Sequence, residues 1–316
     1  MSENRFSIPS PEEHVDSHLT GGYRVDIFVK RDDMIHPVVS GNKWRKLKWN
    51  IENAKEQGRD TLLTFGGAHS NHIAATAEAA RIFGFKSIGI IRGEDADLRN
   101  PTLRTALRNG MKIHRVSRTE FRRNGDRDYI ESLRHRFGAF YFIPQGGENH
   151  YGVQGCTEIM KELKRHYHRI FVACGTATTL SGMALGNARR SMLTGVSALK
   201  GGEFLFETVK HYVSKTFQDE ETEREVLKNI EVLTDYHFGG YAKTKSELIE
   251  FMRNFYQKTS VKLDPVYTGK TAFAMYDVLK KYKANSNEKW LLIHSGGLQG
   301  IEATEAKLGR SIYSNC

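Results

Sequence analysis

The chain has 316 residues, of which 39% are hydrophobic and 10% aromatic, and its formal net charge is +10. This length exceeds what one hydrophobic core usually serves, so we expect two domains, and the composition excludes a disordered protein. The apolar runs are strand-sized, too short for a membrane-spanning helix, and the first residues resemble no export signal. We therefore expect a cytoplasmic protein.

The cysteines are Cys156, Cys174 and Cys316, an odd number without CxxC spacing. This pattern fits reduced thiols better than a disulfide framework or a zinc site.

The 47 basic residues outnumber the 37 acidic ones, which makes a nucleic-acid binder a rival interpretation. However, the basic residues are spread along the chain and accompany no known nucleic-acid motif. A diffuse positive charge also suits a small anionic substrate. We therefore expect neither a nucleic-acid partner nor a membrane partner.

Strand-like apolar runs alternate with helical patterns through the first half of the chain. The spacing predicts a parallel sheet with right-handed crossovers. A helix is expected from Asn42, which can cap it, to Gly58. The other expected elements are strands at 25–29, 61–65, 86–92, 111–116 and 140–143, helices at 73–83 and 101–109, and a polar, basic stretch at 117–136.

The second half continues this alternation. The expected elements are strands at 169–173, 196–199 and 290–293, helices at 153–167, 180–189, 204–213 and 246–256, a helix ending at Tyr282, and an exposed charged stretch at 219–228. We find no internal repeat, so the chain is predicted to be an α/β protein.

The stretch Ser40–Leu47 combines a glycine, an asparagine and several positive charges. Gly41 allows a tight backbone turn, and Lys43 falls on the first turn of the expected helix. A lysine becomes nucleophilic when nearby cations lower its pKa, and it can then form a Schiff base with an aldehyde cofactor. Arg45 and Lys46 supply such cations. Taken alone, the run is more often a basic surface helix, but the glycine-rich loops that follow favour the functional interpretation.

A Gly-Thr-Ala-Thr-Thr loop joins an expected strand to an expected helix. The free N–H groups and the positive dipole of a helix N-terminus favour an anion such as phosphate, and threonine hydroxyls add donors. The loop matches neither the Walker pattern nor GxGxxG, and a plain helix cap is an alternative. Its residues are Gly175, Thr176, Ala177, Thr178 and Thr179.

A second glycine-led loop precedes the helix expected at 73–83 and ends in Ser70, Asn71 and His72. These residues could hold a carboxylate in the same way. A hydrolase serine is disfavoured because the GxSxG pattern is absent. The loops that hold His69, His72 and His294 lack acidic residues at ligand spacing, so we expect structural or hydrogen-bonding histidines and no metal site.

Two anion sites and one activated lysine together suit a cofactor that carries an aldehyde and a phosphate, acting on a substrate that carries a carboxylate. Pyridoxal phosphate with an amino-acid substrate meets this description.

Four motifs, in the same order along the chain, resemble the 1-aminocyclopropane-1-carboxylate (ACC) deaminase and D-cysteine desulfhydrase family. They are Ser-Gly-Asn-Lys43-Trp-Arg-Lys46, Gly-Gly-Ala-His-Ser70-Asn71-His72, Gly-Thr-Ala-Thr-Thr at 175–179, and Asp-Pro-Val-Tyr267-Thr268-Gly-Lys. The resemblance covers roughly residues 20–300.

The resemblance implies pyridoxal 5'-phosphate as cofactor and a homodimer. It also implies two open three-layer α/β domains with largely parallel sheets, similar to the tryptophan synthase β chain (PLP fold type II). A small domain at 47–145 would be inserted in a large cofactor-binding domain made of 1–46 and 146–316.

The resemblance assigns the cofactor contacts residue by residue. Lys43 would form the Schiff base, and Lys46 and the 175–179 loop would hold the phosphate. Asn71 would bond the phenolic oxygen, and Thr268 would face the pyridine nitrogen.

The resemblance assigns the substrate contacts in the same way. Ser70, Asn71 and His72 would receive the substrate carboxylate, and Ser70 would also transfer a proton. Tyr241 and Tyr267 match two active-site tyrosines of the family, although core packing is an alternative for each.

Thr268 stands where ACC deaminases carry a glutamate at the pyridine nitrogen. A hydroxyl cannot hold a protonated pyridinium as a carboxylate does, which weakens the electron sink and favours β-elimination over ring opening. Trp44 and Leu298-Gln299 also depart from the family pattern beside the expected pocket.

We therefore predict a lyase that acts on a small amino acid such as D-cysteine and gives a keto acid, ammonia and sulfide. The alternatives are an ACC deaminase and a non-catalytic PLP- or ligand-binding protein.

Overall fold

The computed structural model describes residues 5–15, 25–188, 190–282 and 288–313. The chain divides into two compact units, each made of two segments. Unit 1 contains residues 1–6 and 36–155, and unit 2 contains residues 7–35 and 156–316. The domain division expected at 46/47 and 145/146 remains a prediction. Residues 1–4 and Cys316, on which the expectations about an export signal and a third thiol rest, lie outside the described residues.

Unit 1 is built around a four-stranded parallel sheet in the order β5-β4-β3-β6. Its strands are β3 (Thr61–Gly67), β4 (Lys86–Arg92), β5 (Met111–Val116) and β6 (Tyr141–Ile143). β3 and β4 are buried along almost their whole length, as expected for parallel strands that are covered on both faces.

Helices cover both faces of the unit 1 sheet. One face packs against α2 (Asn71–Phe83) and α3 (Pro101–Arg108) in a cluster that includes Ile73, Ile91 and Leu103. The other face packs against α4 (Arg118–Phe121) and α5 (Arg127–Phe137) in a cluster that includes Phe65 and Leu133. Unit 1 also contains α1 (Asn42–Glu56), η4 (Gln145–Gly147) and the start of α6 (His150–Lys161).

Unit 2 contains a six-stranded sheet in the order β1-β2-β10-β7-β8-β9. Its strands are β1 (Glu12–Val15), β2 (Val25–Lys30), β7 (Arg169–Cys174), β8 (Met192–Ser197), β9 (Ile230–Leu233) and β10 (Glu288–Ile293). Among the described strands only β1 pairs antiparallel, so the carboxyl ends of β2, β10 and β7 share one edge of the sheet.

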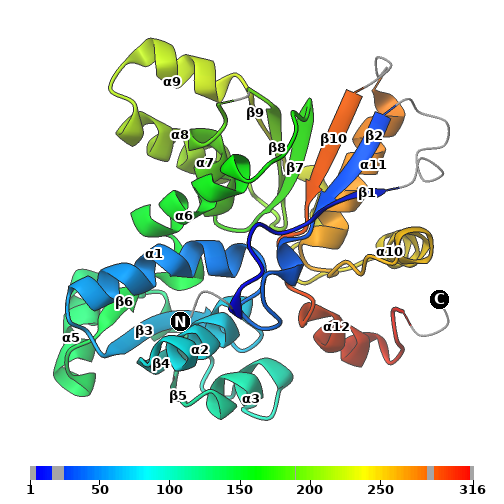
Figure 1. The fold of residues 1–316 in the computed structure, drawn as a ribbon. Helices are drawn as coiled ribbons and strands as arrows, with labels where there is room; N and C mark the ends of the chain where they lie inside the picture. The colour runs from blue at the N-terminus through cyan, green and yellow to red at the C-terminus, as the bar shows by residue number, and fades with distance from the viewer. Residues whose placement is uncertain (1–4, 16–24, 189, 283–287, 314–316) are drawn as a thin grey trace. The chain divides into compact units, whose positions relative to one another are not determined.

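The unit 2 sheet is also covered on both faces. α10 (Ser246–Thr259) and α11 (Thr268–Lys281) pack on one face, and α7 (Thr178–Leu185) and α8 (Phe204–Thr216) pack on the other (Figure 1). The remaining elements are η3 (Asp32–Met34), η5 (Asp235–His237), α9 (Glu220–Leu227) and α12 (Gly300–Leu308). Two three-layer α/β units with largely parallel sheets confirm the predicted fold class.

Several expected boundaries differ from the structure. Asn42 is the first residue of α1 and not its cap, because the turn is made one residue earlier by Gly41 at φ 62°. The helix expected at 153–167 runs from His150 to Lys161. The charged stretch at 219–228 forms α9, because the Asp219 carboxylate accepts a hydrogen bond from the backbone N–H of Thr222 and caps that helix.

None of the described helices combines the length and the hydropathy that crossing a membrane would require.

Candidate active site

Lys43 lies on the first turn of α1, directly after the left-handed turn at Gly41. The next two cations of this helix are buried, since Arg45 is fully inaccessible and Lys46 is 3% exposed. The start of α1 therefore concentrates positive charge inside unit 1.

Trp44 belongs to an aromatic stack in the core of unit 1. Its ring lies 3.7 Å from that of Phe6 and 5.8 Å from that of Phe83, centroid to centroid, and both pairs are nearly parallel. The side chain is 6% exposed. This residue, whose role the sequence left open, anchors the start of α1 by packing.

The loop between β3 and α2 folds back tightly on the strand. A Cβ placed on Gly66 would lie 2.5 Å from Cγ1 of Ile73 and 2.9 Å from Oγ of Ser70, so only glycine fits there. Ser70 precedes the first residue of α2, Asn71, but its hydroxyl makes no capping hydrogen bond to the helix. The half-buried Ser70 and Asn71 thus stand at a helix N-terminus, where backbone N–H groups favour an anion.

His72 is a buried, neutral histidine. Its Nε2 lies 2.9 Å from Oγ1 of Thr64, which in turn donates to the carbonyl of Ile143 at 2.8 Å. Burial, together with the positive charges of Lys43 and Lys46, holds the pKa of His72 well below its ordinary value. The ring therefore carries no charge near neutral pH.

Lys46 and His72 flank the same glycine of the η4 loop. A Cβ placed on Gly147 would lie 3.0 Å from Cβ of Lys46 and 3.6 Å from Cε1 of His72. The loop is fixed to α1 by two hydrogen bonds between amide side chains: Nδ2 of Asn149 donates to Oδ1 of Asn50 at 2.7 Å, and Nδ2 of Asn50 donates to Oδ1 of Asn149 at 3.2 Å. Unit 1 thus brings Lys46 and His72 together.

The loop between β7 and α7 has the backbone of an anion site. Ala177 adopts a left-handed conformation (φ 55°) directly before the first helical residue, Thr178. A left-handed residue at such a junction exposes successive N–H groups, which form a concave anion-binding arrangement. The hydroxyls of Thr176 and Thr178 are 2.9 Å apart, so two further polar groups meet at the same loop.

Tyr267 lies beside this loop, and the other candidate tyrosine, Tyr241, packs against Tyr267. A Cβ placed on Gly175 would lie 3.4 Å from Cε1 and 3.7 Å from the hydroxyl oxygen of Tyr267. The ring of Tyr241 lies 6.0 Å from that of Tyr267 in an edge-on arrangement. Burial, followed by the neighbouring Tyr241, raises the pKa of Tyr267 well above its ordinary value, so its phenol stays protonated.

The hydroxyl of Thr268 is part of a hydrogen-bonded turn that could not be recognised from the sequence. This hydroxyl donates to Oδ1 of Asp264 at 2.7 Å and accepts from the backbone N–H of Asp264 at 2.8 Å. The Asp264 carboxylate also accepts the backbone N–H groups of Val266, Tyr267 and Thr268 at 2.8–2.9 Å. Asp264 therefore builds the start of α11 and sets the position of Tyr267.

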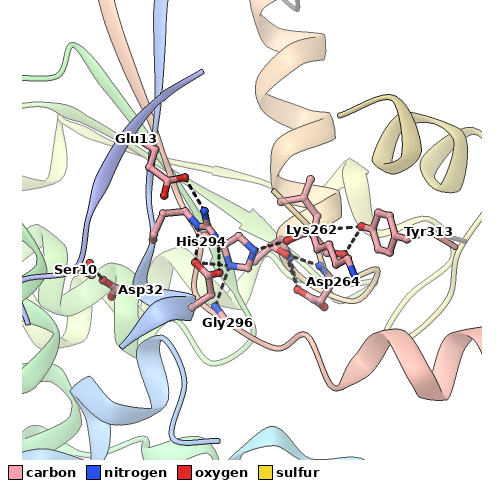
Figure 2. Close-up of polar contacts among 12 residues, drawn as sticks. Ser10, Glu13, Asp32, Lys262, Asp264, His294, Gly296 and Tyr313 are labelled. Atoms are coloured by element: carbon pink, nitrogen blue, oxygen red, sulfur yellow. Dashed lines mark hydrogen bonds and ion pairs between the residues drawn. The ribbon is translucent and has the colours of Figure 1, made fainter. Parts of the chain in front are cut away.

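A polar network joins the ends of β2 and β10 and the segment before Asp264 (Figure 2). Arg31 binds the Asp33 carboxylate with two nitrogens, at 2.9 and 2.8 Å. Oδ1 of Asp33, which accepts from Nε of Arg31, also lies 3.5 Å from Nδ1 of His294, and Nε2 of His294 lies 2.7 Å from the carbonyl of Lys262. His294 is thus a buried, hydrogen-bonded histidine, as expected, and sequence reasoning did not select its neighbours Arg31 and Asp33.

The candidate residues therefore form two groups, one in each unit. Unit 1 holds Lys43, Lys46, Ser70, Asn71 and His72, and unit 2 holds Gly175–Thr179, Tyr241, Tyr267 and Thr268. Within the described part of the chain, no three His, Cys, Asp or Glu side chains are placed to hold a metal ion.

Comparison with known proteins decides the family. The sequence profile of the family described as "pyridoxal-phosphate dependent enzyme" matches residues 15–296. The chain belongs to this family. Pyridoxal phosphate is accordingly its cofactor.

The similar proteins point to one branch of these enzymes. A Pyrococcus abyssi protein provisionally named 1-aminocyclopropane-1-carboxylate deaminase is 32% identical over 292 residues, which cover 88% of this chain and 86% of that protein. The bifunctional mitochondrial D-cysteine desulfhydrase/1-aminocyclopropane-1-carboxylate deaminase of Arabidopsis thaliana is 30% identical over 299 residues, 87% of this chain and 73% of that protein. The crystal structure of an ACC deaminase homologue superposes with a TM-score of 0.79 at 26% identity and covers 96% of this chain and 94% of that one.

Proposed function

We propose that this pyridoxal-phosphate enzyme is a D-cysteine desulfhydrase-type lyase. The net reaction takes D-cysteine and water to pyruvate, ammonia and hydrogen sulfide. The Cα–H bond and the Cβ–S bond break, and the released enamine hydrolyses to the keto acid. The proposal rests on the family, on the two groups of site residues and on Thr268.

The residues present suit the cofactor. Its phosphate is an anion, and the β7–α7 loop offers helix N–H groups, a left-handed junction at Ala177 and the hydroxyls of Thr176 and Thr178. Lys46 would add a buried positive charge, Lys43 would hold the cofactor through its amine, and the family resemblance gives Asn71 the phenolic oxygen. When bound, the cofactor supplies the electron sink that makes the Cα proton acidic.

The helix N-terminus at Ser70 and Asn71 would receive the substrate carboxylate. His72, the third residue of this group, has a neutral side chain that brings no positive charge to the carboxylate. It would instead bind the carboxylate through its backbone N–H, one of the donors in the first turn of α2 that have no partner within the helix. Lys43 or Ser70 would move the Cα proton. Tyr267 keeps its proton near neutral pH and would act as a donor beside Tyr241.

Thr268 carries the choice between the two family reactions. Its hydroxyl already donates its one hydrogen bond to the Asp264 carboxylate, and the side chain is fully buried. It would leave one acceptor lone pair for a neighbour, whereas a carboxylate at this position would offer a negative charge to the pyridine nitrogen. A weaker electron sink favours elimination of a good leaving group such as thiolate over opening of the ACC ring.

Keto-acid release by the purified, cofactor-loaded protein tests this function. D-cysteine, L-cysteine and ACC would be supplied side by side, and pyruvate and 2-oxobutyrate would be measured separately. We expect pyruvate and sulfide from D-cysteine. An ACC deaminase would instead release mainly 2-oxobutyrate from ACC. That result would refute the claim that Thr268 favours elimination over ring opening.

Two lysine variants of the same helix control the experiment. Lys43→Ala should lose the visible absorbance of the bound cofactor that borohydride abolishes, and its activity should fall by about 10²- to 10⁴-fold or more. Lys55→Ala, which removes an exposed lysine near the end of α1, should keep both. Wild-type protein that binds the cofactor but releases no keto acid from any of the three amino acids would contradict the proposed substrate.

A further inference from the structure

The ammonium of Lys270 is buried among backbone carbonyl groups. The side chain is 1% exposed, and Nζ donates to the carbonyls of His237 at 2.8 Å, Gly240 at 2.9 Å and Ala198 at 3.5 Å. An ammonium has three N–H donors, so these three carbonyls match its full capacity. Removing a charge from water costs several kcal/mol, and a methionine of similar length would fill the space without that cost. Packing alone therefore does not explain why a charged residue stands at this buried position.

Two of the three carbonyls belong to one irregular loop, the 235–241 loop. Phe238, Gly239 and Gly240 all have positive φ, at 51°, 99° and 121°. The N–H groups of Gly239 and Gly240 donate to the ring and to the carbonyl of His237 within the loop, and contacts with the rest of unit 2 add to these local bonds in fixing its shape.

One face of α11 makes these contacts in order along the helix. Tyr236 donates to Asp277 at 2.6 Å, and the ring of Phe238 meets that of Phe273 edge-on at 5.0 Å. Lys270 lies one turn before Phe273, and binds the carbonyls on either side of Phe238 and Gly239. Positions 270, 273 and 277 are spaced i, i+3 and i+7, which places them on the same side of a helix.

The loop ends at Tyr241, whose ring reaches Tyr267, three residues before Lys270. Tyr241 itself is 47% exposed, so little packing of its own side chain fixes it. Its position is instead set by the backbone of Gly240, which Lys270 binds directly.

We propose that Lys270 is a positioning residue, an internal cation whose bonds to the 235–241 loop hold Tyr241 against Tyr267. It acts as a bound metal cation would, by gathering carbonyl oxygens around one positive charge, but it is tethered to α11. Its effect on turnover rests on the proposed function, in which both tyrosines meet the substrate. Its effect on the loop does not.

The test compares Lys270→Ala, which leaves space for a small cation, with Lys270→Met, which fills that space without a charge. Hydrogen exchange of the 238–243 segment is measured on the cofactor-loaded protein without substrate. We expect exchange to rise by about tenfold or more in both variants, since each lost bond to a charged donor weakens the loop. Methylammonium chloride should restore protection in the alanine variant in a saturable way, and leave the methionine variant unchanged.

Activity provides a second readout. In both variants kcat/KM should fall by about 10- to 100-fold, as expected when a group at the substrate is displaced. Methylammonium should restore it only in Lys270→Ala. Lys280→Ala, an exposed lysine of the same helix, should match the wild type with and without the salt. In a Tyr241→Ala background, Lys270→Met should cause little further loss of kcat/KM.

Several results would overturn the proposal. One is wild-type exchange in 238–243 for Lys270→Met, which also decides the matter if the alanine variant fails to fold. Another is faster exchange of the loop in Lys270→Ala that methylammonium does not slow. A third is that the losses of kcat/KM caused by Lys270→Met and by Tyr241→Ala add up fully in the double variant. If exchange behaves as expected while the wild type releases no pyruvate from D-cysteine, the proposed function fails and the positioning role of Lys270 stands.

Discussion

Thr268→Val removes one hydroxyl and preserves the shape of the side chain. The hydroxyl donates to the Asp264 carboxylate and accepts from the Asp264 N–H, and both residues are buried. A hydrogen bond to a charged group contributes about 1.5–3 kcal/mol, and a buried N–H left without a partner costs about 1–3 kcal/mol. Because such contributions are not fully additive, we expect the turn at Asp264–Thr268 to lose about 2–4 kcal/mol.

Hydrogen exchange measures this loss locally, which matters because a chain of two units need not unfold in a single step. At about 1.36 kcal/mol per tenfold change, the amides of Val266, Tyr267 and Thr268 should exchange about 30- to 900-fold faster in the valine variant. Thr268→Ser keeps the hydroxyl and is the matched control, with exchange close to that of the wild type.

Activity should follow the same order, because the turn sets the position of Tyr267. The reasoning would be refuted if the valine and serine variants exchanged these amides at the same rate. It would also be refuted if the fast exchange extended evenly over unit 2, since the loss would then not be local.

Three further outcomes follow from single contacts. Gly155→Ala should destabilise unit 1 by about 1–3 kcal/mol in urea unfolding, because the new Cβ would lie 1.9 Å from the carbonyl oxygen of Arg45; Gly125→Ala, with open space around it, should be close to neutral. The pKa of His72 in the folded state lies well below its ordinary value of 6.5, so the unfolded chain binds more protons near that pH. The free energy of unfolding should therefore fall as pH drops through 6.5, by up to about 1.4 kcal/mol per pH unit. A His72→Gln variant should lack this pH dependence. Burial, partly offset by Asp264, lowers the pKa of Lys270 from 10.5 to about 8. Between pH 8 and 10.5 the lysine is therefore protonated in the unfolded chain but not in the folded one, so the free energy of unfolding of the wild type, relative to that of Lys270→Met, should rise with pH. An equal pH dependence of both proteins would contradict this value.

The regular part of the fold was predictable where long apolar runs are bounded by glycine. The strands β4 and β5 match their predicted ranges residue for residue, and the helix between β3 and β4 ends as expected at Phe83, where Gly84 follows in a left-handed conformation. In such segments burial, period and turn chemistry agree, so few alternatives remain.

The short elements were not predictable for the opposite reason. β9 has four residues and is mostly half-exposed, and α12 buries only Thr304. Neither carries a clear period, and both depend on tertiary contacts. The start of α1 was misplaced by one residue, because asparagine is a common cap and the left-handed turn of Gly41 cannot be distinguished from it in sequence.

The candidate site divides in the same way. Lys43, Ser70 and the 175–179 loop lie in contiguous motifs, so residue types and spacing were enough to select them. Asp264 was visible only as part of a motif, and its acceptor role depends on how the chain turns between it and Thr268. The carbonyl partners of Lys270 come from segments about 30 and 70 residues away, and such convergence is a product of tertiary structure that no local pattern encodes.

The strand order of unit 2 has a consequence for synthesis on the ribosome. β2 is made early, but besides β1 its neighbour in the sheet is β10, which begins only at Glu288. Unit 1 lies almost entirely between these two strands in the sequence, so it can fold as it emerges while β2 still lacks its parallel partner. Closing the unit 2 sheet is therefore a late, high-contact-order step, and until then the apolar edge of β2 is a surface for chaperones to protect.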